Sequence, residues 1–94
     1  MVLVRWSIVE TDGGQRHFVG ARHDGLGGRV SSAVVEFYPA ARTGVTRSGR
    51  EYLLVGAPGF DLDAAYVFEA WMKINEVESV RNVTADLFED TDLD

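Results

Sequence analysis

The chain has 94 residues, of which 46% are hydrophobic and 26% are charged, as is usual for a single globular domain. It contains no cysteine, which excludes disulfide bonds, thiolate nucleophiles and Cys-ligated zinc. The formal net charge is −6, but residues 1–60 carry seven arginines and five acids, whereas residues 61–94 carry ten acids and two basic side chains. This balance disfavours general binding to polyanions and leaves room for a local anion site in the first part.

The start of the chain has no basic stretch followed by a long apolar run, so the sequence predicts no secretory signal. The longest apolar runs have about four residues, far fewer than the ~20 that span a bilayer. We therefore expect a cytoplasmic protein that has no membrane partner.

The first two predicted elements form a β-hairpin. Residues 2–10 alternate with a period of two, which is typical of a strand and puts Val4 and Trp6 on one face. The Asp-Gly pair at 12–13 suits a tight turn. Residues 15–23 then form the returning strand.

Three further strands are predicted before residue 56. Residues 29–38 have the pattern of one continuous strand, ended by Pro39 because proline cannot donate to a β-ladder. Residues 44–47 and 50–55 form a second hairpin, with Ser48-Gly49 as a two-residue turn.

Apolar residues take helical spacing after residue 60. The predicted inward face consists of Ala64, Val67, Phe68, Trp71 and Ile74. Asp61 suits the N-cap of this helix and Asn75 suits its C-cap. We expect Trp71 to be largely buried against the sheet.

The pattern weakens after the helix. Residues 80–84 fit a short sixth strand, which the sequence leaves open. Residues 86–94 contain five acids in nine positions and are expected to form a flexible acidic tail. Residues 1–85 are then one globular domain.

These elements predict an α+β fold, an antiparallel β-meander of five or six strands that carries one C-terminal amphipathic helix. Several strands are apolar on both faces, and one helix covers only one face of a sheet. The other face must curl into a partial barrel, be covered by the C-terminal segment or meet a second copy. We expect a homodimer that buries residues such as Val30, Val34, Leu53 and Val55, with barrel closure as the alternative.

One group of side chains suggests a binding site, at and around the second hairpin. The group is Arg42, Thr46, Arg47, Ser48 and Arg50. A two-residue turn would place Arg47 directly opposite Arg50, where like charges are destabilising. A phosphate, a carboxylate or an acidic protein segment would relieve that repulsion. The competing interpretation is a solvated hairpin tip.

The other motifs predict neither a metal site nor a catalytic group. His17 and His23 lie six residues apart on one expected strand, about 20 Å at 3.3 Å per residue, too far to share an ion. The glycines at 25–28 precede a strand, whereas a phosphate loop precedes a helix. We expect no metal, no cofactor and no catalytic residue.

Three segments carry a resemblance to known sequences. Residues 29–37, the Thr-Arg-Ser-Gly-Arg run at 46–50 and the Gly-Ala-Pro-Gly bend at 56–59 resemble short proteins of unknown function from high-GC bacteria. The resemblance covers residues 5 to about 84. It implies a bacterial protein and assigns no site residue.

The sequence favours a non-enzymatic interaction module that self-associates or binds a protein partner. The alternative is binding of nucleic acid or a small anion through Arg42, Arg47 and Arg50. A small-molecule enzyme that uses no metal is the third hypothesis.

Overall fold

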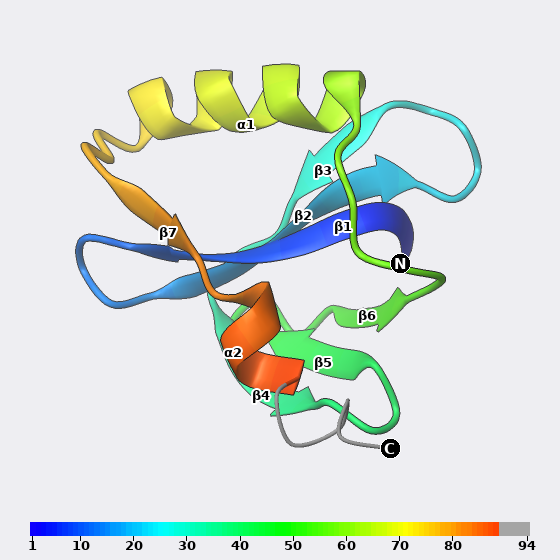
Figure 1. Ribbon diagram of the computed structural model, residues 1–94. Coiled ribbons are helices and arrows are strands. Elements are labelled where there is room, and N and C mark those ends of the chain that lie inside the picture. Colours follow the sequence, from blue (N-terminus) through cyan, green and yellow to red (C-terminus); the bar gives the residue numbers. More distant parts are fainter. Residues whose placement is uncertain (89–94) are drawn as a thin grey trace.

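Seven strands and two short helices make up the α+β structure of residues 1–88 in the computed structural model (Figure 1). The strands are β1 (Val2–Thr11), β2 (Arg16–Arg22), β3 (Gly28–Val30), β4 (Val34–Tyr38), β5 (Thr43–Thr46), β6 (Glu51–Leu54) and β7 (Val80–Asn82), and the helices are α1 (Leu62–Ile74) and α2 (Thr84–Phe88). They form one sheet in the order β3-β2-β1-β6-β5-β4, with β7 also paired to β1. Neither helix of the described part is long and apolar enough to cross a bilayer.

The β1–β2 hairpin forms where the sequence predicts it. Its antiparallel register places Val9 opposite His17. Gly14 in the turn has a φ of +84°, and its N–H donates to the Thr11 carbonyl at 2.9 Å. The positive φ explains why a glycine closes this turn.

The prediction of one continuous strand over residues 29–38 is wrong. The strand is interrupted at residues 31–33, and two separate strands, β3 and β4, form instead. At the break, Phe18 N–H donates to Ser31 Oγ at 2.8 Å, and Ser31 N–H donates to Phe18 O at 2.9 Å. The Ser31 hydroxyl thus takes a bond that a strand carbonyl would otherwise accept. β3 pairs with β2 and β4 pairs with β5, so the break carries the chain from one end of the sheet to the other.

The prediction that the strands follow one another in a simple meander is also wrong, although the predicted α+β class is confirmed. β1 pairs with β2 along one edge, and its other edge pairs with β6 and then β7. The β1–β6 pairing is parallel and places Val2 beside Leu53. The sixth strand that the sequence left open is present as β7, antiparallel to β1.

A bulge in β1 changes which side chains share a face. Arg5 has a φ of +45°, and the pairing with β2 shifts between Val4 and Ser7. The extra residue reverses the alternation of faces. Leu3, rather than Val4, therefore lies in the same core cluster as Trp6.

The main core lies where the sheet curls over itself. Its buried members are Leu3, Trp6, Ile8, Phe18, Tyr52, Leu54, Val83 and Phe88. The ring of Phe18 in β2 lies 5.8 Å from that of Phe37 in β4, although three strands separate β2 from β4 in the sheet. The sheet therefore folds back without closing into a barrel, and α2 helps to cover the face that α1 leaves uncovered.

α1 packs on β2 and β3, on the other face of the hairpin (Figure 1). The predicted caps are confirmed, because Asp61 accepts a hydrogen bond from Ala64 N–H at 3.0 Å and Asn75 ends the helix. The helix approaches β3 very closely at Gly28, where a Cβ atom would lie 2.5 Å from the Ala64 Cα. Only glycine fits this contact without movement of the helix.

The predicted inward face of α1 is confirmed in its first part and wrong at its end. Ala64 is buried, and Phe68 and Trp71 are partly buried, with their rings stacked at 5.8 Å. Ile74, however, is 80% exposed. β3, on which the helix packs, has three residues, so the last helical turn extends past it.

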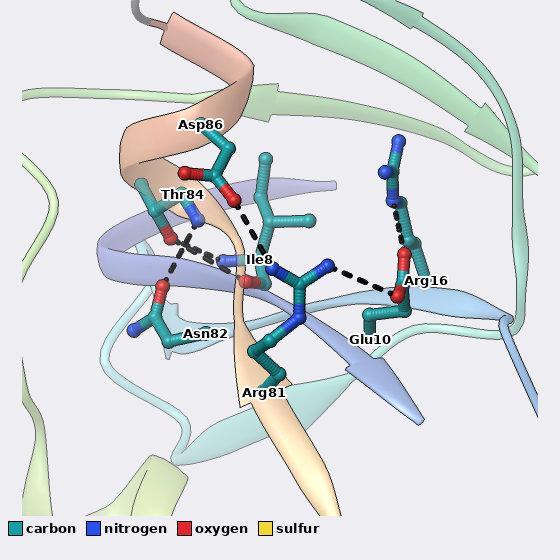
Figure 2. A network of polar contacts seen from close by, with 7 residues as sticks. All are labelled: Ile8, Glu10, Arg16, Arg81, Asn82, Thr84 and Asp86. Atoms are coloured by element: carbon teal, nitrogen blue, oxygen red, sulfur yellow. Dashed lines mark hydrogen bonds and ion pairs between the residues drawn. The ribbon is translucent and has the colours of Figure 1, made fainter. Parts of the chain in front are cut away.

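Hydrogen bonds attach α2 and β7 to the middle of β1 (Figure 2). Thr84 Oγ1 accepts from Ile8 N–H at 2.8 Å, and Thr84 N–H donates to Asn82 Oδ1 at 3.0 Å. The Thr84 side chain is therefore satisfied inside the fold. These bonds set the position of α2 over the core.

An ion-pair chain runs beside this attachment (Figure 2). Arg81 reaches Glu10 and Asp86 at 3.3 Å each, and Arg16 Nε lies 3.1 Å from Glu10. Hydrogen bonds from Arg81 and Arg16 hold the pKa of the Glu10 carboxyl below its ordinary value.

The expected acidic tail begins inside α2. Residues 86–88 belong to this helix, and Phe88 is 6% exposed, with its ring 5.4 Å from Trp6 and 5.5 Å from Phe37. The rest of the expected tail, residues 89–94, lies outside the described residues.

Candidate functional site

The hairpin predicted to bind an anion has a different turn from the one expected. The β5–β6 register pairs Val45 with Glu51, and Thr46 N–H donates to Arg50 O at 3.1 Å. The turn therefore contains three residues, 47–49, and Gly49 takes a φ of +86°. Arg47 and Arg50 are not opposite each other, so the expected repulsion between paired strand positions is absent from this hairpin.

The hydroxyl groups of the predicted site are used within the fold. Thr46 is buried, and its Oγ1 lies 3.2 Å from Ser48 Oγ. Ser32 Oγ in turn contacts both the Oγ and the N–H of Ser48 at 3.3 Å. Arg47 and Arg50 are exposed at this tip and form no ion pair with residues 1–88.

Arg42 lies apart from the other two arginines. It follows β4 with a φ of +55°, and its Nη1 donates to the Gly56 carbonyl at 2.6 Å. Its guanidinium carbon is 5.8 Å from the ring centroids of both Trp6 and Phe88. A guanidinium within about 6 Å of an aromatic ring centroid gains cation–π attraction.

A cleft of about 740 Å³ surrounds this arginine. Its lining consists of Trp6, Ser7, Arg42, Pro58, Gly59, Phe60, Asn82, Thr84, Ala85 and Phe88. This volume lies within the range of about 300–1,000 Å³ that is usual for ligand pockets. Because Phe60 is 63% exposed, the cleft presents an aromatic ring at its rim.

The β1 bulge helps to build the cleft. It places Trp6 where its indole Nε1 donates to Gly56 O at 3.2 Å and its carbonyl accepts from Gly59 N–H at 2.9 Å. The segment between β6 and α1 is thereby held along β1, with Phe60 at the rim. Gly20 on β2 leaves room for the bulged backbone at Trp6, since a Cβ there would lie 3.0 Å from the Trp6 Cβ and 3.1 Å from its Cα.

An ion pair fixes the far end of the same segment. Arg5 Nε lies 2.9 Å from the Asp61 carboxylate, which also caps α1. The hydrogen bond from Ala64 N–H, followed by that from Arg5, holds the pKa of the Asp61 carboxyl below its ordinary value.

The described lining of the cleft offers one cation, aromatic rings and small polar groups. Its described lining has no carboxylate and no imidazole, so it offers none of the usual general bases. Within residues 1–88, no three His, Asp or Glu side chains gather as a metal-binding group. The remaining chemistry is that of an arginine among aromatic and small polar side chains.

No family model, no curated protein and no solved structure matches this chain.

Sequence reasoning found Arg42 but missed the aromatic residues around it. Trp6, Phe60 and Phe88 come from β1, the segment before α1 and α2, so no local spacing connects them. One signal in the sequence could have indicated this site. Phe60 is an aromatic residue directly after a Pro-Gly bend, where a side chain is not expected to be buried in the core.

Proposed function

We propose that this protein is a non-enzymatic interaction module of the bacterial cytoplasm, which binds a segment of a partner protein in the Arg42 cleft. The segment carries a carboxylate beside an apolar side chain. The observation that supports this is the guanidinium of Arg42 held over Trp6 and Phe88, at the base of a cleft with an exposed aromatic rim.

The charges of the site favour a carboxylate over a nucleic acid. One hydrogen bond of Arg42 goes to Gly56 O, and a guanidinium has further donors that suit the two oxygens of a carboxylate. Arg42 is the one charged side chain in the described lining. The net charge of −6 would repel a ligand with many phosphates.

The apolar part of the ligand would lie against Phe60, Pro58 and Ala85. Aromatic and arginine side chains are enriched among residues that dominate binding energy in protein interfaces. Phe60 is a useful probe, because it is exposed and its truncation leaves the core intact.

Selection from a random peptide-display library against the immobilised full chain tests this function. We expect the enriched peptides to share an acidic residue next to an aromatic or aliphatic one. Phe60→Ala should weaken their binding about tenfold or more, whereas Leu26→Ala, an exposed change in the β2–β3 loop, should not. Failure to enrich such peptides, or equal binding to both variants, would contradict the proposal.

A second candidate function is self-association through the outer face of β4–β6. Leu53 and Val55 are 40% and 38% exposed, and Tyr38 of β4 is also exposed. β4 ends the strand order, so its outer edge has no strand partner within the described residues. Val30 and Val34 pack instead against the two core clusters, so the proposed dimer face retains only part of the set that the sequence suggested.

Light scattering at about 50 µM tests the dimer. A mass of twice 10.4 kDa that falls to the monomer value in Leu53→Lys, but not in Leu26→Lys, would support it. A mass near 10.4 kDa that does not change with concentration would reject it.

A further inference from the structure

The outer side of α1 carries a row of exposed side chains. Leu62 and Tyr66 are each 78% exposed and Ile74 is 80% exposed, which makes them the three most exposed large hydrophobic residues of the described chain. Ala70, between Tyr66 and Ile74, is also exposed. In Figure 1 this side of the helix faces away from the sheet, and no other described element covers it. We call these four residues the α1 ridge.

The spacing of the α1 ridge makes it one continuous surface. Its members follow one another every four positions, and side chains four apart are neighbours on a helix. The opposite side of α1 packs on the sheet through Ala64, Phe68 and Trp71. The helix is therefore apolar on two sides, of which the described fold covers one. Single exposed apolar residues are ordinary on a protein surface, whereas a contiguous row is typical of an interface.

The α1 ridge is complementary to a second copy of itself when the two helices run in opposite directions. Ridges of residues four apart interdigitate at a crossing angle of about 50°, the commonest helix packing. The ridge is centred on position 68, so the antiparallel order places Tyr66 opposite Ala70 of the second copy. It places Leu62 opposite Ile74 of the second copy. A large ring then meets a small methyl group, whereas the parallel order would set Tyr66 against Tyr66 and leave a gap at Ala70.

Charge favours the same antiparallel order. Asp63 lies in the first turn of α1 and Lys73 in its last turn, where Lys73 reaches Glu69 of its own helix at 3.9 Å. In the antiparallel order, Lys73 of each copy lies toward the Asp63 end of the other copy, rather than toward a second Lys73. The two helix dipoles also oppose each other, as they do in antiparallel helix pairs generally.

We propose that two copies of this chain associate through the α1 ridge, as an antiparallel helix pair related by a two-fold axis. None of the four residues is among the described lining of the Arg42 cleft, and none belongs to β4–β6. Association through α1 is therefore independent of both functions proposed above. A helix of 13 residues is about 20 Å long, so the contact is small and the dimer should depend on concentration.

Disulfide cross-linking tests the order of the two helices, because the chain contains no cysteine of its own. Leu62→Cys, Ile74→Cys and Leu26→Cys are oxidised with copper phenanthroline, each alone and in pairwise mixtures. Positions 62 and 74 are separated by roughly 18 Å along the helix at 1.5 Å per residue, whereas a disulfide joins Cα atoms about 5–6 Å apart. The mixture of Leu62→Cys with Ile74→Cys should therefore be the one sample that gives a strong band at twice 10.4 kDa.

Two results of the cross-linking would overturn the proposal. The first is the absence of that band, or an equal band in the mixtures that contain Leu26→Cys, which would show random collision. The second is a strong band from Leu62→Cys alone, which would show that the helices do not pair in the antiparallel order.

Light scattering from about 20 to 500 µM separates the α1 ridge from the β4–β6 face. The mass of the wild-type chain should rise with concentration toward twice 10.4 kDa. Tyr66→Lys should hold the mass near 10.4 kDa, whereas Leu53→Lys and Leu26→Lys should behave as the wild type does. A mass that falls in Leu53→Lys but not in Tyr66→Lys would overturn the proposal and support the sheet dimer. A wild-type mass that stays at 10.4 kDa over the whole range would overturn both.

Discussion

Arg5 and Asp61 lie 56 residues apart in the sequence, yet the Arg5 Nε donates to the Asp61 carboxylate at 2.9 Å. Asp61 accepts the Ala64 N–H through its other oxygen. One carboxylate therefore joins the bulge of β1 to the first turn of α1.

The first prediction concerns this carboxylate. Asp61→Ala should lower the free energy of unfolding by about 1–2 kcal/mol, because an N-cap acceptor is lost. Asp63→Ala, an exposed change in the same helical turn, should have a smaller effect. Urea denaturation measures the free energy of unfolding of both variants. Equal losses in Asp61→Ala and Asp63→Ala would show that the N-cap hydrogen bond of Asp61 does not stabilise the fold.

The second prediction concerns the pH dependence of stability. The pKa of Asp61 is lowered in the folded state, so its stabilisation is present above its unfolded pKa of about 3.9 and is lost as the pH falls through the folded pKa. Asp61→Asn does not titrate. The stability difference between wild type and Asp61→Asn should therefore be largest near pH 7 and should shrink below about pH 4. Urea midpoints measured from pH 7 to pH 3 test this, and a constant difference would contradict it.

The third prediction concerns the end of the described chain. Phe88→Ala should lower the free energy of unfolding by about 3–5 kcal/mol, as large truncations in a core do, because the Phe88 ring packs on Trp6 and Phe37. Ala85→Ser, on the exposed side of α2, is the control and should change little. A Phe88→Ala protein with the wild-type melting temperature would show that α2 does not contribute to the core.

The fourth prediction concerns the close approach of α1 to β3. Gly28→Ala should destabilise the fold by about 1–3 kcal/mol, because the new methyl group would press on the backbone at Ala64 and displace the helix. Gly13→Ala meets nothing closer than 3.8 Å and should be tolerated. Thermal melts of the two variants provide the comparison.

The parts of the fold that were predictable from the sequence are those set by neighbouring residues. The Asp-Gly turn before β2 and the caps Asp61 and Asn75 act over a few positions, and each appears where the pattern places it. The break at Ser31 was not predictable, because the hydroxyl competes for a hydrogen bond with Phe18, thirteen residues earlier.

The Arg42 cleft depends on contacts that sequence spacing does not record. Arg42 and Arg47 were identified as cations, but the curl of the sheet puts them in different cavities. His17 looked like an ordinary strand residue, whereas in the fold its ring packs against Trp71 of α1.

The central position of β1 has a consequence for how the chain folds. β1 precedes its partners β2, β6 and β7 in the chain, and its Ile8 N–H donates to the Thr84 hydroxyl, 76 residues later. Proteins dominated by such distant pairings fold in roughly milliseconds to seconds, more slowly than helical domains. During synthesis, the part of β1 that pairs with β7 lacks its partner on that edge until residues 80–82 have been made. β1 is thus made before all of its partners and completes its pairing only with β7, so its unpaired edge is open to wrong partners in the meantime.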